Sequence, residues 1–172
     1  MNTLEILSET PEYYHTYVKL VSGEDLEKEL EKSKIFSQEF FSKIPIEKYD
    51  YAYSTGKWTI KAVLQHITDC ERVFAYRALR FSRFDKTALP GFDENLFADS
   101  ARQMKTSIQF LIDEYLNVRN STIDLFKNMT EEMLVFKGNA NGHFFSTRSL
   151  AFIIIGHNMH HCNIINERYL NI

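Results

Sequence analysis

The segment SLAFIIIGHNMHHCNIINERY, residues 149–169, decides the fold. Its first turns, residues 150–155, are apolar nearly all the way round a helix, so more than one face of that helix is expected to be buried. A central position in a bundle of helices or a subunit interface would provide that cover. The second half brings together His157, His160 and His161, three of the six histidines in the chain. Packing alone rarely requires such a cluster.

Three earlier segments also carry apolar residues at helical spacing, with few Pro and Gly to interrupt them. The first runs from about Gly23 to Ser42 and stops before Pro45. The second begins after Thr59, a residue suited to cap a helix, and ends before Leu89-Pro90-Gly91. The third opens at Thr106-Ser107-Ile108-Gln109, which fits a capping box. Four long helices are therefore predicted.

The connections between these helices shape the expected bundle. Residues up to Tyr17 form a turn or a short helix, and another short helix follows Asp93. The turn residues in 137–142 predict a small hairpin or a long loop before the last helix. Connections of this length can alter the simple up-and-down order. The prediction is an all-α protein: a four-helix bundle with a crossover connection, in a single domain over residues 1–172.

Composition and charge limit the partners. A net charge of −3 with scattered Lys and Arg gives no electrostatic reason to expect nucleic acid or an acidic membrane surface. No apolar run approaches the roughly 20 residues of a membrane span, and the first residues lack a signal-peptide pattern, so we expect a cytoplasmic protein. Cys70 and Cys162 are far apart in sequence, and we expect reduced thiols rather than a disulfide.

The histidine spacing predicts a divalent metal site. At about 100° per residue, His157 and His161 differ by about 40° around the helix, while His157 and His160 differ by about 60° in the opposite sense. Both pairs can reach one ion, but the apolar stripe of the helix runs more centrally through His157 and His161. We therefore expect these two to face inward and His160 to lie nearer an edge.

A third ligand has to come from elsewhere in the chain. His66 is the best candidate, because it is the only histidine on another predicted long helix, and Cys70, one turn later, is the rival. Three neutral imidazoles with open coordination positions are typical of a catalytic site, with Zn²⁺ or Ni²⁺ as the metal. Such a site can activate water or bind a substrate thiolate. Alternatively, these are buried core histidines satisfied by hydrogen bonds.

Several stretches together resemble the DinB-like superfamily of metalloenzymes. They are GKWTIKAVLQHITDCER at 56–72, FAYRALRF at 74–81, LPGFDE at 89–94 and the closing HNMHH at 157–161. The resemblance covers about Ser33 to Asn171 and implies a four-helix bundle, often dimeric. It also implies a divalent metal held by one histidine of the second helix and two of the last. By position these are His66, His157 and His161.

The resemblance leaves the reaction open, since fold and ligand set do not choose a chemistry. Relatives include thiol-dependent S-transferases, a thiol-dependent isomerase and proteins labelled as hydrolases. We therefore expect a metal-dependent enzyme of the hydrolase or thiol-dependent S-transferase type. It would act as a homodimer on a small-molecule substrate, with a low-molecular-weight thiol as a second cofactor. The alternative is a non-catalytic metal-binding or stress-associated helical dimer.

The residues close to His66 are each open to a functional and a structural interpretation. Asp69 or Glu71 could orient a ligating imidazole through its second nitrogen, as metal sites commonly require. A surface ion pair is the favoured reading for Asp69. Trp58 is expected to pack as a staple against the second helix, and Cys70 to be a small buried side chain that can line the pocket.

Polar residues further along the helices are also open to two interpretations. Asn158 either faces the cavity or serves as a polar partner on the helix flank. Arg77, Arg80 and Arg83 form an i, i+3, i+6 series that could pair with an anionic substrate or the carboxylate of a thiol cofactor. Salt bridges to neighbouring helices are the favoured use of these arginines.

Overall fold

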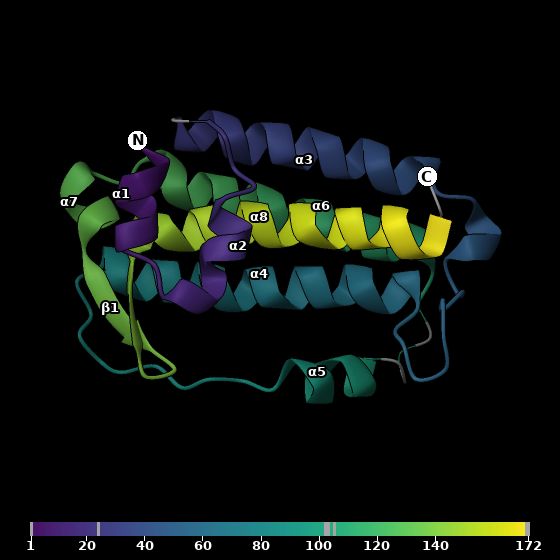
Figure 1. The fold of residues 1–172 in the computed structure, drawn as a ribbon. Coiled ribbons are helices and arrows are strands. Elements are labelled where there is room, and N and C mark those ends of the chain that lie inside the picture. The colour runs from purple at the N-terminus through teal and green to yellow at the C-terminus, as the bar shows by residue number, and fades with distance from the viewer. Residues whose placement is uncertain (1, 24, 102–103, 105, 171–172) are drawn as a thin grey trace.

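Four long helices form the body of the protein (Figure 1). The computed structural model describes residues 2–23, 25–101, 104 and 106–170. The long helices are α3 (Leu26–Lys43), α4 (Ile60–Ser82), α6 (Ile108–Lys127) and α8 (Thr147–Ile165). The predicted all-α four-helix bundle is therefore confirmed.

The bundle does not follow simple up-and-down order. Helices α6 and α8 each pack against both α3 and α4, which places α3 and α4 at opposite corners although they are consecutive in the chain. Figure 1 shows that α4 and α6 run in the same direction, because the chain between them returns along the outside of α4. This return carries α5 (Glu94–Ala101), the predicted short helix, and it is the predicted crossover connection.

Short elements cover the two ends and one side of the bundle. At the N-terminus α1 (Thr3–Ser8), η1 (Glu12–Tyr14) and α2 (His15–Val18) form a compact segment that packs on α8. The predicted hairpin before the last helix is present as the antiparallel pair β1 (Lys137–Ala140) and β2 (His143–Ser146). The sequence interpretation did not include η2 (Ile46–Lys48), α7 (Glu131–Val135) or the π-helical turn η3 (Asn166–Leu170).

Side-chain caps fix where the long helices begin. Thr59 caps α4 as predicted, because its hydroxyl accepts the backbone N–H of Ala62 at 3.2 Å. The expected capping box at Thr106 is wrong by one residue, since Ser107 is the N-cap of α6. Gln109 does not reach back to the cap, because its side-chain amide donates to Asp113 at 2.9 Å.

The first turns of α8 lie in the middle of the molecule. Residues 150–155 are all buried, and α1, α2, α3, α4 and α7 of the same chain pack around α8. The apolar character of these turns therefore reflects a central position, and it no longer argues for a subunit interface. Cys70 and Cys162 are both buried free thiols, as expected. Within the described ranges, the helices are too short or too polar to cross a bilayer.

Candidate metal centre

Three imidazoles from two helices converge at the contact between α4 and α8. Nε2 of His157 lies 3.1 Å from Nε2 of His66 and 3.1 Å from Nε2 of His161. One ligand nitrogen from each ring lies within 4.8 Å of the other two. The structure thus brings together the three histidines that the sequence suggested, one from α4 and two from successive turns of α8.

The spacing of these nitrogens fits a shared ion. Two nitrogens that each lie about 2.0–2.1 Å from one tetrahedral Zn²⁺ are separated by about 3.3 Å. The two separations of 3.1 Å are close to that value. Without an ion, each of these contacts requires one nitrogen that carries a proton and one that carries a lone pair. Among the described residues the donor set is three imidazoles without a thiolate or carboxylate, which matches an open catalytic type of site.

Burial keeps the imidazoles in the form that binds metals. It lowers the pKa of His66 to about 4. Burial, together with the neighbouring His66 and His160, lowers the pKa of His161 to about 3. The pKa of His157 falls well below its ordinary value for the same reasons, burial first and the adjacent histidines second. All three rings are therefore neutral near pH 7, with lone pairs free for a cation.

The two rival ligands lie beside the cluster. Sγ of Cys70 is 3.6 Å from Nδ1 of His66 and 3.8 Å from its Nε2, so the thiol sits against the ring rather than completing the nitrogen set. Burial raises the pKa of the Cys70 thiol to about 12, which disfavours the thiolate a metal would need. His160 is half-buried and its ring packs 5.2 Å from the ring of Tyr17.

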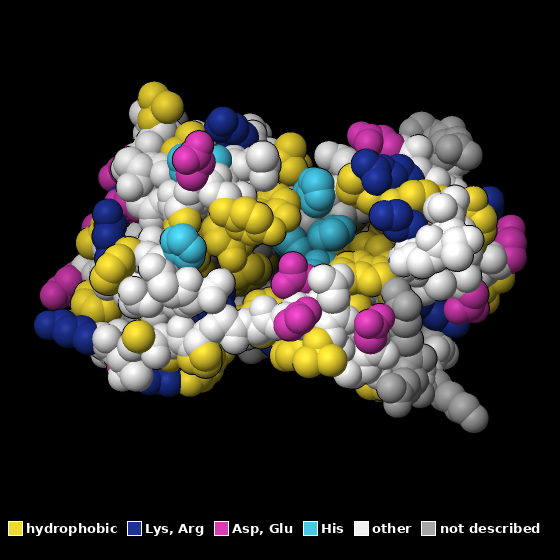
Figure 2. Space-filling view, turned by 60° about the horizontal axis from the view of Figure 1, so that its bottom comes forward, with side chains coloured by type: hydrophobic (Ala, Val, Ile, Leu, Met, Phe, Trp, Pro, Cys, Tyr) yellow, Lys and Arg dark blue, Asp and Glu magenta, His cyan; other side chains and the backbone are white. Residues whose placement is uncertain are grey.

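The cluster lies at the wall of a cavity of about 510 Å³. Figure 2 shows histidines in a hollow bordered by hydrophobic side chains, with acidic side chains along one edge. Six of the lining residues are aromatic: Tyr13, Tyr14, Tyr17, Trp58, Phe74 and Phe92. The other lining residues outside the histidine cluster are Cys70, Arg77, Glu94, Asn95, Asn141 and His143.

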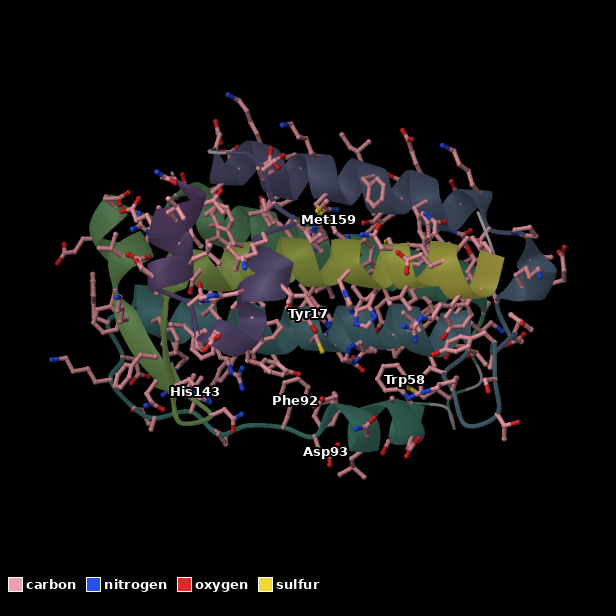
Figure 3. All side chains as sticks on the ribbon, viewed as in Figure 1. Tyr17, Trp58, Phe92, Asp93, His143 and Met159 are labelled. Atoms are coloured by element: carbon pink, nitrogen blue, oxygen red, sulfur yellow. The ribbon has the colours of Figure 1, made fainter. Side chains whose placement is uncertain are left out.

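These walls come from segments far apart in the chain. Tyr17 on α2, Trp58 before α4 and Phe92 before α5 surround the site, and His143 lies on the hairpin (Figure 3). The centroid of the Trp58 ring lies 4.8 Å from the centroid of the His66 ring. Trp58 therefore contacts α4 as predicted, and it also packs against one of the three clustered histidines. The part of the wall formed by Tyr13, Tyr14 and Tyr17 was not predicted, because these residues carry no spacing typical of a metal or catalytic site.

Gly156 allows the N-terminal segment to approach the site. A Cβ atom at this position would lie 2.0 Å from the backbone carbonyl oxygen of Tyr17. The glycine therefore permits α2 to lie directly on α8, one residue before His157. As a result the Tyr17 ring packs edge-on against the His157 ring, with 5.4 Å between centroids.

Neither acidic candidate orients a ligating imidazole. Glu71 accepts two hydrogen bonds from Arg119 on α6 and points into the bundle centre. Asp69 accepts from the Gln65 amide at 3.0 Å and from Arg72, which is the ion-pair reading favoured for it. The alternative in which Glu71 or Asp69 orients a ligating imidazole is therefore wrong, and the ion pair favoured for Asp69 is confirmed. Glu71 lies on the side of α4 that faces α6, and Asp69 lies beside Gln65 and Arg72.

Of the polar residues Asn158, Arg77 and Arg80, the structure places one, Arg77, at the cavity. Asn158 donates to Ser33 and Ser37 on α3, so it is a structural partner rather than a cavity residue. Arg80 pairs with Asp85 in the loop after α4. Arg77 instead lines the cavity and has no carboxylate partner among the described residues.

Fold and site together define a helical bundle with a three-histidine centre in an aromatic cavity. Residues 36–165 match the family model of the DinB superfamily, and the chain belongs to this superfamily. The predicted family resemblance is therefore confirmed. Among curated proteins, none matches this chain.

The fold is shared with solved structures, and one of them is described by its function. It is YfiT from Bacillus subtilis, described as a probable metal-dependent hydrolase with an unusual four-helix bundle topology. The TM-score is 0.74, the sequences are 14% identical, and the match covers 85% of each chain. At this identity the likeness establishes the common topology and leaves the chemistry of the present chain to its own residues.

Proposed function

We propose that this protein is a metal-dependent enzyme in which His66, His157 and His161 hold one divalent ion, Zn²⁺ or Ni²⁺. The observation that carries the proposal is the convergence of three neutral Nε2 atoms at the wall of a cavity that a small molecule can enter. A divalent ion with three nitrogen ligands supplies Lewis-acid chemistry toward water or a thiol.

The surrounding residues of the chain perform the other tasks of such a site. Tyr17, Trp58 and Phe74 provide an apolar wall that binds a substrate and limits the access of water. Burial in this wall holds the three imidazoles neutral and fixed in position. The reaction we propose is hydrolysis or thiol-dependent S-transfer, and the cavity has room for a small substrate beside a thiol.

The experiment distinguishes the two reactions. Protein loaded with Zn²⁺ or Ni²⁺ is assayed on activated aryl esters, and separately on electrophilic aryl halides with and without a low-molecular-weight thiol. A hydrolase acts on the first group without thiol, and a transferase acts on the second group only with thiol. His66→Ala should abolish the turnover, whereas His15→Ala, on the N-terminal segment, should not.

The competing proposal is a metal-binding module without catalysis. In that case His66→Ala lowers the melting temperature of the loaded protein and no substrate is turned over by either form. The apolar cavity against the histidines favours the enzyme, because a purely structural metal site is usually closed by four protein ligands.

A further inference from the structure

Arg77 is a buried cation that lines the cavity of the histidine cluster. Three arginines of the described residues are buried to 3% exposure or less. Arg119 pairs with the Glu71 carboxylate, and Arg148 pairs with the carboxylates of Glu5 and Glu9. Arg77 differs from both, since no described carboxylate lies within 4.0 Å of its guanidinium.

The contacts of Arg77 hold it in place but leave its charge without a counter-ion. One Nη atom donates to the carbonyl oxygen of Pro90 at 3.1 Å, and the guanidinium lies over the rings of Phe74 and Phe92 at 5.6 and 5.9 Å. Burial lowers the pKa of Arg77, although the side chain stays charged at any physiological pH. A buried charge without an anionic partner is costly, so the presence of one at the cavity wall points to a ligand that supplies the anion.

A single phenyl ring separates this cation from the histidine cluster. The Phe74 ring centroid lies 6.4 Å from the ring of His157 on one side and 5.6 Å from the guanidinium carbon on the other. All three side chains line the same cavity. A ligand of the size of one aromatic ring with a short side chain can therefore touch the guanidinium with one end and the histidines with the other.

We infer that Arg77 binds the carboxylate of the substrate, and that the substrate is a flat, largely apolar carboxylic acid whose reacting group lies at the three histidines. This inference rests on the proposed function for the reacting group, but binding of the carboxylate at Arg77 does not require the metal. The aromatic lining matches the apolar body, and a guanidinium edge matches the two oxygens of a carboxylate.

The charge balance favours a carboxylate over a phosphate ester. One guanidinium neutralises one negative charge, whereas a phosphate group carries about −1.5 to −2 at pH 7. Glu94 also lines the cavity, but its side chain is exposed and forms no ion pair with Arg77. Solvent therefore screens the repulsion between the Glu94 carboxylate and the carboxylate of the ligand. At the Arg77 end of the cavity, the described lining side chains supply no second positive charge, so a group with a single negative charge is matched best there.

The test compares trans-cinnamate with cinnamamide, an uncharged molecule of the same shape. Binding to the full-length protein is measured by calorimetry in the metal-free and the Zn²⁺-loaded forms. We expect cinnamate to bind at least about tenfold more tightly than cinnamamide in both forms, as a charge-assisted hydrogen bond predicts. Arg77→Met should remove this preference and leave the affinity for cinnamamide unchanged.

Two variants make the comparison specific. Arg80→Met is the matched control on the same helix, because Arg80 pairs with Asp85 outside the cavity, and it should keep the preference for cinnamate. Arg77→Lys keeps a positive charge and should retain part of the preference. Should Arg77→Met fail to fold, the Arg77 Nε–H resonance of the wild type must shift at lower concentrations of cinnamate than of cinnamamide, and by more at saturation.

Three outcomes would overturn the inference: equal affinities of the wild type for both compounds, a full preference in Arg77→Met, or a preference that exists only in the Zn²⁺-loaded form. The last would mean that the ion, not Arg77, holds the carboxylate. A protein that binds no metal but prefers cinnamate through Arg77 would refute the metal-dependent function while leaving the carboxylate site intact.

Discussion

Arg119 donates two hydrogen bonds to the carboxylate of Glu71 in the centre of the bundle, at 2.7 and 2.8 Å. Both side chains are buried. Arg119 also donates to Ser33 at 2.8 Å, and Ser33 accepts a further bond from Asn158. The network therefore joins α3, α4, α6 and α8, and it ends one residue from His157. It fixes how α8 lies against α4 at the level of the histidine cluster.

Breaking this pair should destabilise the protein strongly. Glu71→Gln leaves the Arg119 charge buried without a counter-ion, and we expect a loss of about 3–5 kcal/mol in the free energy of unfolding, measured by urea denaturation. Replacing both residues by Met should recover most of that loss, because no unpaired charge remains. The matched control is Glu39→Gln at the exposed pair with Lys43, which should change stability by less than about 0.5 kcal/mol. If the Glu71→Gln variant were as stable as the wild type, Glu71 and Arg119 would not form a buried ion pair that holds the bundle together.

Adding one methyl group at Gly156 should displace the N-terminal segment. The new Cβ would meet the Tyr17 carbonyl oxygen, a backbone atom that cannot move without α2. We expect Gly156→Ala to cost about 1–3 kcal/mol and to expose residues 3–18 to proteolysis. Asn163→Ala, at an exposed position of the same helix, serves as control. Unchanged stability and protease resistance in Gly156→Ala would show that α2 does not pack as described.

The attachment of the same segment should depend on pH through Glu9. Burial raises the pKa of Glu9, but the hydrogen bonds from Arg148 and Ser146 outweigh it, so the pKa lies below its ordinary value of 4.5. A lowered carboxyl pKa stabilises the folded state above pH 4.5, and the contribution is lost as the pH falls below that value. Glu9→Gln should therefore lose about 1.5–3 kcal/mol at pH 7 and progressively less below pH 4.5.

Thermal melts of wild type and variant across pH 3–7 provide the measurement, with the exposed Glu12→Gln as control. A constant difference between wild type and Glu9→Gln over the whole range would rule out this linkage.

The sequence predicted the parts that depend on local spacing. The helical repeat placed His157 and His161 on one side of α8, and the apolar stripe around them excluded His160 from that side. The cap at Thr59 and the loop after α4 bounded the helix that carries His66. Each of these features is encoded within a few residues.

The features that depend on distant pairing were not predictable in this way. Glu71 and Arg119 lie on different helices, and helical spacing gives the face of each residue but not its partner. The position of Tyr17 in the cavity wall depends on a segment of three short helices that packs on α8, which is possible because Gly156 has no Cβ atom. Arg77 is one of three similarly spaced arginines, and only the structure separates it from Arg80.

Metal content is the most direct test of the central claim. Untagged full-length protein is incubated with Zn²⁺ or Ni²⁺, desalted and analysed by mass spectrometry of the elements. We expect one tightly bound ion per chain, loss of the ion in His66→Ala, His157→Ala and His161→Ala, and retention of the ion in His160→Ala. A wild-type protein that retains no ion, or a His66→Ala variant that retains as much as the wild type, would contradict it.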